Sequence, residues 1–454
     1  MMKKTKIKTA IVGAGLTGLT TAFYLKKAGI EVEIFEKDDH SGGVIQTHHE
    51  NGFTYESGPN TGMLSRPEVV ELLGELKNDC TLEVADEAAK ARWIWKGKKW
   101  NPLPSGLTSG ISTSLFTFPD KLRLLGEPFR KKGENPNETL AGLVLRRMGK
   151  SFLHYAIDPF ILGIYSGDPA RLVTKYAFPK LYRLEQDYGS FIKGAVKKAK
   201  EPKTEREKKA TKEIFSVAGG LGNLIQALEK HIGKENIHLN CKNLSFQQNE
   251  NGFSTKHSDH VFSHVVSTTG GFALEQLFPF IDENQLKPVL KMEYSKVVQV
   301  TLGFYNWGGI PLRAFGGLVP SVEQRRILGV LFLSSFLKNR ATEKGALLSV
   351  FLGGVRKPEI FELSDDEITG MVKEELTEMM LLKKWRPDLV KIFRYRHAIP
   401  QYGVESEEKL KAISWLEKEF PGLVLAGNIR DGIGIADRIN QGRTVASEII
   451  DSLT

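Results

Sequence analysis

Three glycines and one glutamate near the start of the chain have the spacing of a site that binds phosphate and ribose. Gly13, Gly15 and Gly18 directly follow the apolar run 9–12, where the chain must turn from a strand into a helix. The first glycine permits the tight turn, the second lets a pyrophosphate approach the backbone, and the third lets the helix pack on the strand. Glu36 lies near the offset of about 20 residues at which a carboxylate accepts hydrogen bonds from a ribose. This combination predicts a dinucleotide site.

The elements that must position these residues form one strand–helix–strand unit. Residues 9–12 suit a buried strand, a helix follows the glycines, Gly29 ends it, and residues 30–35 alternate as a second strand. Leu16 and Thr17, between the second and third glycines, are expected to bind the cofactor with them. The phosphates would lie at the positive N-terminus of that helix. A lone glycine pattern also occurs in ordinary strand-to-helix turns, but the complete unit with its terminal acid favours the dinucleotide.

A second group of glycines helps to distinguish FAD from NAD and NADP as the bound dinucleotide. Gly42 and Gly43 come soon after Glu36 and Lys37, and this order resembles the extended fingerprint of FAD-containing oxidases. A nicotinamide dehydrogenase does not need the second pair, and the Glu36 carboxylate would repel the 2′-phosphate of NADP. We therefore predict FAD as the cofactor. The fingerprint continues through Gly58, Pro59, Asn60 and Thr61.

Composition describes a soluble globular protein with no membrane span. The chain has 454 residues, of which 41% are hydrophobic and 26% charged, so two or three domains are expected. Its lysine-containing start imitates a secretory signal, but the apolar residues that follow belong to the cofactor strand, so we expect a cytoplasmic protein. The net charge of +9 suits an anionic surface or substrate, or serves solubility alone. Nucleic acid is not expected, because no basic region is interleaved with aromatic residues.

Few residue types in the chain suit metal binding or nucleophilic catalysis. Cys80 and Cys241 cannot form a disulfide framework, and no metal site is expected. The histidines at 257, 260 and 264 have no partner spaced to complete one, and a surface hairpin is predicted there. Arg92 begins an alternating run that turns through Lys-Gly-Lys, which predicts a hairpin. It is either an ordinary solvated strand residue or a two-point contact for a substrate carboxylate.

The rest of the chain predicts an α/β protein, α+β overall, with a Rossmann-like FAD-binding domain, a mixed or antiparallel-sheet substrate domain and an inserted helical cap. A helix opening near Phe215, a strand at 237–241 and a helix around 365–382 with Ser364 as its N-cap are expected. Near the end, Gly427 follows a strand, and Gly434 and Ile435 lead into a final helix directed at the cofactor. The predicted domains are 1–78, 214–275 and 415–454 for FAD; 79–118 and 276–414 for substrate; and 119–213 for the helical segment.

Together these residues resemble the oxygen-dependent, FAD-containing porphyrinogen oxidases of haem biosynthesis, which act on protoporphyrinogen or coproporphyrinogen. The resemblance spans nearly the whole chain, and several of its motifs belong to the substrate side. They include the segments 58–61, 103–107, 158–160, 163–168, 178–181, Glu185 with 188–190, 218–221, 316–320, 327–329, 398–402 and 427–442.

The resemblance implies three two-electron oxidations of a porphyrinogen, with dioxygen reoxidising the flavin and hydrogen peroxide released. FAD would be non-covalent, because no cysteine follows Cys241. No catalytic side chain is singled out beyond flavin N5 chemistry, and Arg92 is expected to hold a propionate. Other enzymes of the haem pathway are expected partners, and the helical segment would make any peripheral contact with the inner face of the cell membrane.

Two other functions stay open at this point. One is a flavin amine oxidase, or a desaturase acting on another apolar substrate. The amine oxidase group shares the fold, although it usually places an arginine after the glycine pair, where this chain has Val44. A flavin- or porphyrin-binding carrier without turnover is favoured only by the lack of an obvious acid or base. The sequence does not choose between protoporphyrinogen and coproporphyrinogen, and it does not give an oligomeric state.

Overall fold

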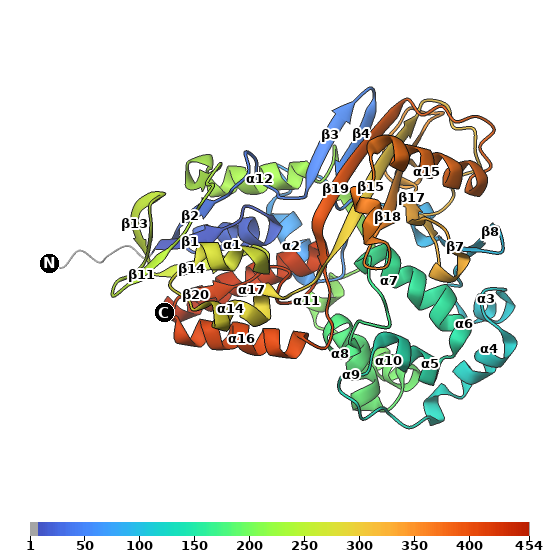
Figure 1. Ribbon diagram of the computed structural model, residues 1–454, viewed down its shortest axis with the longest axis horizontal. Helices are drawn as coiled ribbons and strands as arrows, with labels where there is room; N and C mark the ends of the chain where they lie inside the picture. The colour runs from blue at the N-terminus through green and yellow to red at the C-terminus, as the bar shows by residue number, and fades with distance from the viewer. Residues whose placement is uncertain (1–7, 454) are drawn as a thin grey trace.

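A parallel sheet forms the half of the molecule that contains the glycine-rich turn. The computed structural model describes residues 8–453 (Figure 1). The strand order of this sheet is β10-β2-β1-β14-β20. Its strands are β1 (Lys8–Val12), β2 (Glu31–Phe35), β10 (Ile237–His238), β14 (His264–Ser267) and β20 (Leu423–Leu425). All of its pairings are parallel, so the carboxyl ends of the strands share one edge.

Helices cover both faces of the parallel sheet. Alternate residues such as Ile11 and Ile34 face a core shared with several helices, and the intervening Val12 and Phe35 face a second core. The first layer contains α1 (Leu16–Lys27), α2 (Pro67–Glu75), α12 (Gly222–Ile232) and α17 (Ile435–Leu453). The second contains α13 (Leu274–Leu277), α14 (Glu283–Leu290) and α16 (Ser406–Glu419), with the small antiparallel sheet β11 (Gln247–Asn249), β12 (Gly252–Thr255) and β13 (Ser258–Phe262).

A mixed sheet forms the other half of the molecule, in the order β19-β15-β18-β17-β16-β7-β8. Only the β16–β7 pairing is parallel, which agrees with the expected mixed or antiparallel sheet. Helix α15 (Asp365–Met379) covers one face, and Ser364 caps it as predicted, in a reciprocal capping box with Glu367. The strands are β7 (Arg92–Lys96), β8 (Lys99–Pro102), β15 (Tyr294–Phe304), β16 (Gly316–Leu318), β17 (Ile327–Leu331), β18 (Ala346–Gly353) and β19 (Leu389–Pro400).

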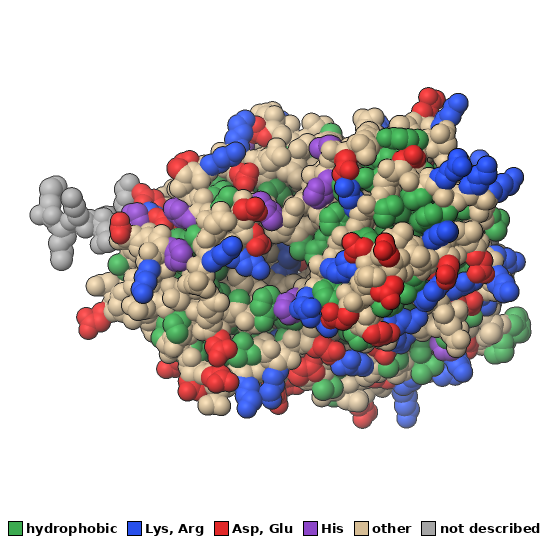
Figure 2. Space-filling view, turned by 45° about the horizontal axis from the view of Figure 1, so that its top comes forward, with side chains coloured by type: hydrophobic (Ala, Val, Ile, Leu, Met, Phe, Trp, Pro, Cys, Tyr) green, Lys and Arg blue, Asp and Glu red, His purple; other side chains and the backbone are tan. Residues whose placement is uncertain are grey.

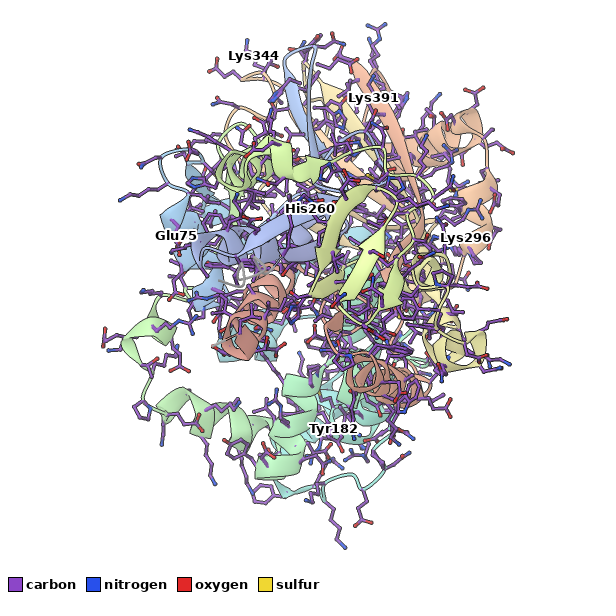
Figure 3. All side chains as sticks on the ribbon, turned by 90° about the vertical axis from the view of Figure 1, so that its left-hand side faces the viewer. Glu75, Tyr182, His260, Lys296, Lys344 and Lys391 are labelled. Carbon is purple, nitrogen blue, oxygen red and sulfur yellow. The ribbon has the colours of Figure 1, made fainter. Side chains whose placement is uncertain are left out.

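Helices between β8 and residue 214 form the helical segment, at the lower right of Figure 1. They are α3 (Leu107–Ser112), α4 (Phe118–Leu125), α5 (Leu140–Arg147), α6 (Lys150–Phe152), α7 (Asp158–Tyr165), α8 (Thr174–Ala177), α9 (Pro179–Tyr188), α10 (Phe191–Lys200) and α11 (Glu205–Lys208). Figure 3 shows Tyr182 in this segment, at the opposite end of the molecule from Lys391 of the mixed sheet and Lys344 of the turn before β18. The residue bounds proposed for the three domains stay a prediction.

A buried charge network ties the helical segment together. Arg147 is fully buried, and it donates to Glu127 at 2.5 Å and to Glu185 at 2.6 Å. Glu127 in turn accepts from the hydroxyl of Ser190 at 2.5 Å and from the backbone N–H of Phe191 at 2.9 Å. Each buried charge therefore has partners from several helices, which is the arrangement that a buried ion requires.

Two sequence predictions about secondary structure are wrong. Residues 214–217 form strand β9 rather than the start of a helix, because they pair with β5 (Gly62–Met63) on one side and β6 (Leu82–Val84) on the other. The helix begins later, at Gly222. The strand expected over 237–241 ends at His238, because the amide of Cys241 bonds instead to the carbonyl of Glu36.

Candidate functional site

The glycine turn has an open side facing the carboxyl edge of the parallel sheet. Gly13 has a φ of +98°, and its amide donates to Phe35 O at 2.9 Å. A Cβ on Gly18 would lie 2.1 Å from Gly13 O, so only glycine allows the helix this close to the turn. A Cβ on Gly15 would meet nothing within 4 Å among the described residues. The open side lies at the N-terminus of α1, which no side chain caps, and it can therefore receive a phosphate.

Glu36 lies beside this turn at the end of β2. Its Oε2 accepts from the Ala14 amide at 2.8 Å and its Oε1 accepts from the Asp38 amide at 3.0 Å. Each carboxylate oxygen keeps a further lone pair for a ligand. Lys37 follows as an exposed residue at the same edge. The structure thus brings the predicted acid to the turn and fixes its orientation by backbone hydrogen bonds.

The glycine pair packs directly on the glycine turn. The amide of Gly42 donates to Ala14 O at 2.8 Å, and a Cβ on Gly43 would lie 3.7 Å from the Cα of Gly15. Near this contact, the buried hydroxyls of Thr17 and Ser41 have no hydrogen-bond partner within residues 8–453. Buried hydroxyls are normally paired, so these two are free to bind a ligand. The sequence identified Thr17 but missed Ser41, whose only signal is its position before the pair.

The segment Gly58–Thr61 connects the half of the molecule that contains the parallel sheet to the mixed sheet. Gly58 has a φ of +104°, and its amide donates to Gln299 Oε1 at 3.0 Å. The Gln299 amide group donates in turn to Glu56 O at 2.9 Å and to Ser349 Oγ at 3.0 Å. Asn60 follows Pro59; it is 4% exposed, and its Oδ1 has no partner in the described part of the chain. Thr61 follows and is half-buried.

The C-terminal segment reaches the glycine turn through Thr268. Thr268 Oγ1 donates to Val12 O at 2.9 Å, and a Cβ on Gly427 would lie 2.8 Å from Thr268 O. The Gly427 amide donates to Gln441 Oε1 at 2.7 Å, and Arg438 donates to the same oxygen at 3.0 Å. Gly434 and Ile435 start α17 as predicted. Thr268 was missed because its partner Val12 lies 256 positions away in the sequence. Arg438 and Gln441 were missed because nothing in the residues around them marks a hydrogen-bonding role.

Arg92 lies in a row of side chains across one face of the mixed sheet. Residues directly opposite one another on paired strands share a face. The row containing Arg92 is Arg92, Gly316, Leu331, Ser349 and Thr301. The next row on the same face is Ile94, Leu318, Gly329, Phe351 and Gln299. Because Gln299 holds Gly58, this face is the one that meets the predicted cofactor segment.

The helical segment covers part of the same face. A Cβ on Gly163 of α7 would lie 2.4 Å from Leu318 Cδ2, so glycine is needed for the close approach of helix and sheet. Along α7, Phe160 and Ile164 are 40% and 43% exposed. The face of the mixed sheet that carries Arg92 is thus contacted by two other parts of the chain: the segment Gly58–Thr61 and helix α7.

Arg92 is half-buried and has no ion-pair partner among the described residues. Burial lowers the pKa of its guanidinium, and its Cζ lies 5.6 Å from the centre of the Phe315 ring. A half-buried cation without a carboxylate is costly unless a ligand supplies one. The site therefore offers an anion contact at one end of a largely apolar face.

These residues fit FAD. The open side of Gly15, the unpartnered oxygens of Thr17, Ser41 and Asn60, and the Glu36 carboxylate offer contacts for pyrophosphate, ribose and flavin along one edge. Within residues 8–453, no group of three or more histidines, cysteines or acids converges as a metal site.

The parallel sheet, the glycine turn with its acid and the mixed sheet facing the same edge define a dinucleotide-binding protein with a flavoprotein fold. A family model described as flavin-containing amine oxidoreductase matches residues 16–450. The chain belongs to this family, and it is an oxidoreductase by that membership. The predicted α/β flavoprotein fold is confirmed, and the family's flavin supports the predicted cofactor.

Individual relatives match over the whole length of the chain. The mitochondrial protoporphyrinogen oxidase of Nicotiana tabacum is 29% identical, covering 98% of this chain and 95% of its own. Coproporphyrinogen III oxidase of Bacillus subtilis is 25% identical over 100% of both chains. A crystal structure from Exiguobacterium sp. 255-15, provisionally named a protoporphyrinogen oxidase, has a TM-score of 0.81 at 22% identity, covering 98% of this chain and 99% of that chain. The similarity to porphyrinogen oxidases that the motifs indicate is therefore confirmed.

Proposed function

We propose that this protein oxidises a porphyrinogen to the porphyrin, using non-covalent FAD and dioxygen, in haem biosynthesis. The observation that carries the proposal is Arg92: an unpaired, half-buried cation at the end of an apolar sheet face that meets the cofactor segment. A porphyrinogen is an apolar macrocycle with propionate arms, and it needs both features. The names of the full-length relatives support the same substrate class.

The chain's own residues would bind and orient the substrate. FAD, when bound, accepts a hydride and passes the electrons to dioxygen. Arg92 would hold a propionate, and Leu331, Leu318 and Phe351 would contact the macrocycle and exclude water. The two rows on this face contain no carboxylate or histidine, so positioning at the flavin, rather than a strong base, would supply the rate enhancement.

The decisive experiment offers the FAD-loaded protein two substrates in air and follows porphyrin fluorescence and peroxide. Coproporphyrinogen III and protoporphyrinogen IX are tested side by side, with oxygen-free samples as the control. Fluorescence that rises in air together with peroxide supports the proposal and ranks the two substrates. Peroxide release with an amine, and none with either porphyrinogen, would identify an amine oxidase. Tight porphyrin binding without turnover would identify a carrier.

We further propose that the helical segment contacts a membrane surface at the inner face of the cell membrane. Four apolar side chains around α4 are exposed: Phe118 at 71%, Leu122 at 52%, Leu125 at 66% and Phe129 at 88%. The Nζ of Lys193 lies 5.6 Å from the centre of the Phe129 ring, which places a cation beside them. Within residues 8–453, no helix is long and apolar enough to cross a membrane. Co-sedimentation with anionic vesicles, lost in Phe118→Ser/Phe129→Ser, tests this contact.

A further inference from the structure

An aromatic stack connects the two sheets across the edge where the cofactor is proposed to lie. The rings of Phe272 and His397 are 4.1 Å apart with 23° between their planes. Phe272 follows β14 of the parallel sheet, and His397 belongs to β19 of the mixed sheet. Phe272 is nevertheless 48% exposed, so it is not held by burial in a core. The contact therefore joins two elements that share no strand pairing.

Tyr294 anchors both partners of this stack. Its hydroxyl accepts from the Gly271 amide at 3.1 Å, which fixes the loop before Phe272. Its ring contacts Phe272 edge-on at 5.8 Å and His397 at 5.4 Å. Because Tyr294 begins β15, which pairs with β19, the three rings form one cluster at the end of the mixed sheet.

The cluster lies over the carboxyl edge of the parallel sheet. Gly270 and Phe272 follow the end of β14 at this edge, and Lys37 follows the end of β2 at the same edge. Burial, then Arg396 and Lys37, lowers the pKa of His397. Open parallel sheets bind ligands outside the carboxyl ends of their strands. Figure 2 shows a hollow at the junction of the two halves, with lysine, arginine and histidine side chains around it.

We propose that the Phe272–His397 stack is a clasp that closes the dinucleotide crevice and slows the release of FAD. The proposal rests on the proposed FAD site. The stack is one of the contacts between the mixed sheet and the edge proposed to hold the phosphates, together with the Gly58–Gln299 hydrogen bond, so its loss should make release easier. An aromatic pair contributes enough to change a release rate by about three- to tenfold.

The test measures FAD release from the holoenzyme at fixed pH, as flavin fluorescence recovered after dilution. His397→Ala and Phe272→Ala should each release FAD about three- to tenfold faster. His397→Phe keeps a stacking ring and should release FAD within about twofold of the unmodified protein. The matched control is Tyr305→Ala, which removes a 39% exposed ring stacked on Phe53 at 5.3 Å, away from the clasp, and should leave release unchanged.

Each outcome decides between the proposals. Unchanged release in both alanine variants, from protein that binds FAD normally, overturns the clasp and leaves the cofactor site intact. An unmodified protein that holds no FAD overturns the cofactor site and the clasp together. Faster release in His397→Phe as well as His397→Ala would assign the effect to the imidazole nitrogens and also overturn a stacking clasp. Unchanged thermal midpoints show that the variants fold.

Discussion

Arg147 in the helical segment and Arg92 on the mixed sheet are both at least partly buried, but within residues 8–453 only Arg147 is paired with carboxylates. Arg147 is completely buried, and two carboxylates from other helices satisfy its guanidinium. Arg92 is half-buried and has only an aromatic ring beside it among the described residues. The described part of the chain supplies both carboxylate partners of the first arginine and none for the second, which is why we propose a substrate carboxylate for Arg92. Charge pairing, rather than residue type or burial alone, is the difference between the two.

The largest expected effect comes from breaking the completed network. Glu127→Ala leaves Arg147 buried with one partner fewer, which should cost about 3–5 kcal/mol of stability. Thermal and urea unfolding followed by far-ultraviolet circular dichroism measure the loss. The control is Glu138→Ala, whose carboxylate pairs with Arg146 at 2.6 Å and is 20% exposed. If Glu127→Ala is no less stable than Glu138→Ala, the network does not hold the helices together.

Lys409 is a third buried cation that sharpens the comparison. It is 1% exposed, and its Nζ contacts only Met292 Sδ at 3.4 Å and the Tyr402 ring at 4.8 Å among the described residues. Burial lowers its pKa from 10.5 to about 8. A depressed lysine pKa opposes folding below pH 8, by about 3 kcal/mol at pH 7, and this penalty fades between pH 8 and 10.5.

Lys409→Met should therefore raise stability by about 2–3 kcal/mol at pH 7 and by progressively less as the pH approaches 10.5. Unfolding measured at several pH values gives the difference directly. The comparison variant is Lys411→Met, which removes an exposed lysine on the same helix. A pH-independent difference would show that Lys409 is not a charge held in an apolar site.

Arg92→Met tests the incomplete arginine. Removing it should raise KM for a porphyrinogen about 10- to 100-fold, equivalent to about 1.4–2.7 kcal/mol, while FAD binding is kept. Stability should stay equal or rise, in contrast to Glu127→Ala, because no partner in the fold loses its charge. Lys99→Met, on the exposed side of the same hairpin, is the control. An unchanged KM would remove Arg92 from the substrate site.

The smallest expected effect concerns Gly15, which, like the Arg92 guanidinium, has space beside it for a ligand. Gly15→Ala should preserve folding but weaken FAD binding about tenfold, or about 1.4 kcal/mol, because the new methyl group occupies the phosphate side of the turn. Flavin fluorescence titration measures the affinity. Gly74→Ala is the matched control and should bind FAD normally, because an added methyl group there also meets none of the described residues within 4 Å.

Local features of the fold were predictable because their causes are local. The glycine turn, the hairpin after Arg92 and the Ser364 cap each depend on residues within a few positions of one another. Strand β9 was not predictable in this way. Its partners are residues 62–63 and 82–84, more than a hundred positions earlier, and its Phe-Ser-Val pattern runs straight into glycines.

The same limit applies to the candidate site. The sequence indicates Glu36, the glycine pair and Arg92, since their types and spacing carry information. Gln299 and Thr268 hold their partners across long sequence separations, and nothing next to them marks that role. The contact between Phe272 and His397 could not be predicted either, because ring stacking between two sheets imposes no characteristic spacing on the sequence.

The strand order of the parallel sheet also governs when the protein can take up its cofactor during synthesis. The sheet combines residues 8–12 with residues 423–425, and α17 packs on α1 from residue 435 onward. At about 5–20 residues per second, the ribosome needs on the order of half a minute or more to supply both ends of this set. The glycine turn is thus synthesised early, but α17, which packs on the helix that follows the turn, is synthesised much later. We expect FAD uptake to follow the packing of α17 on α1.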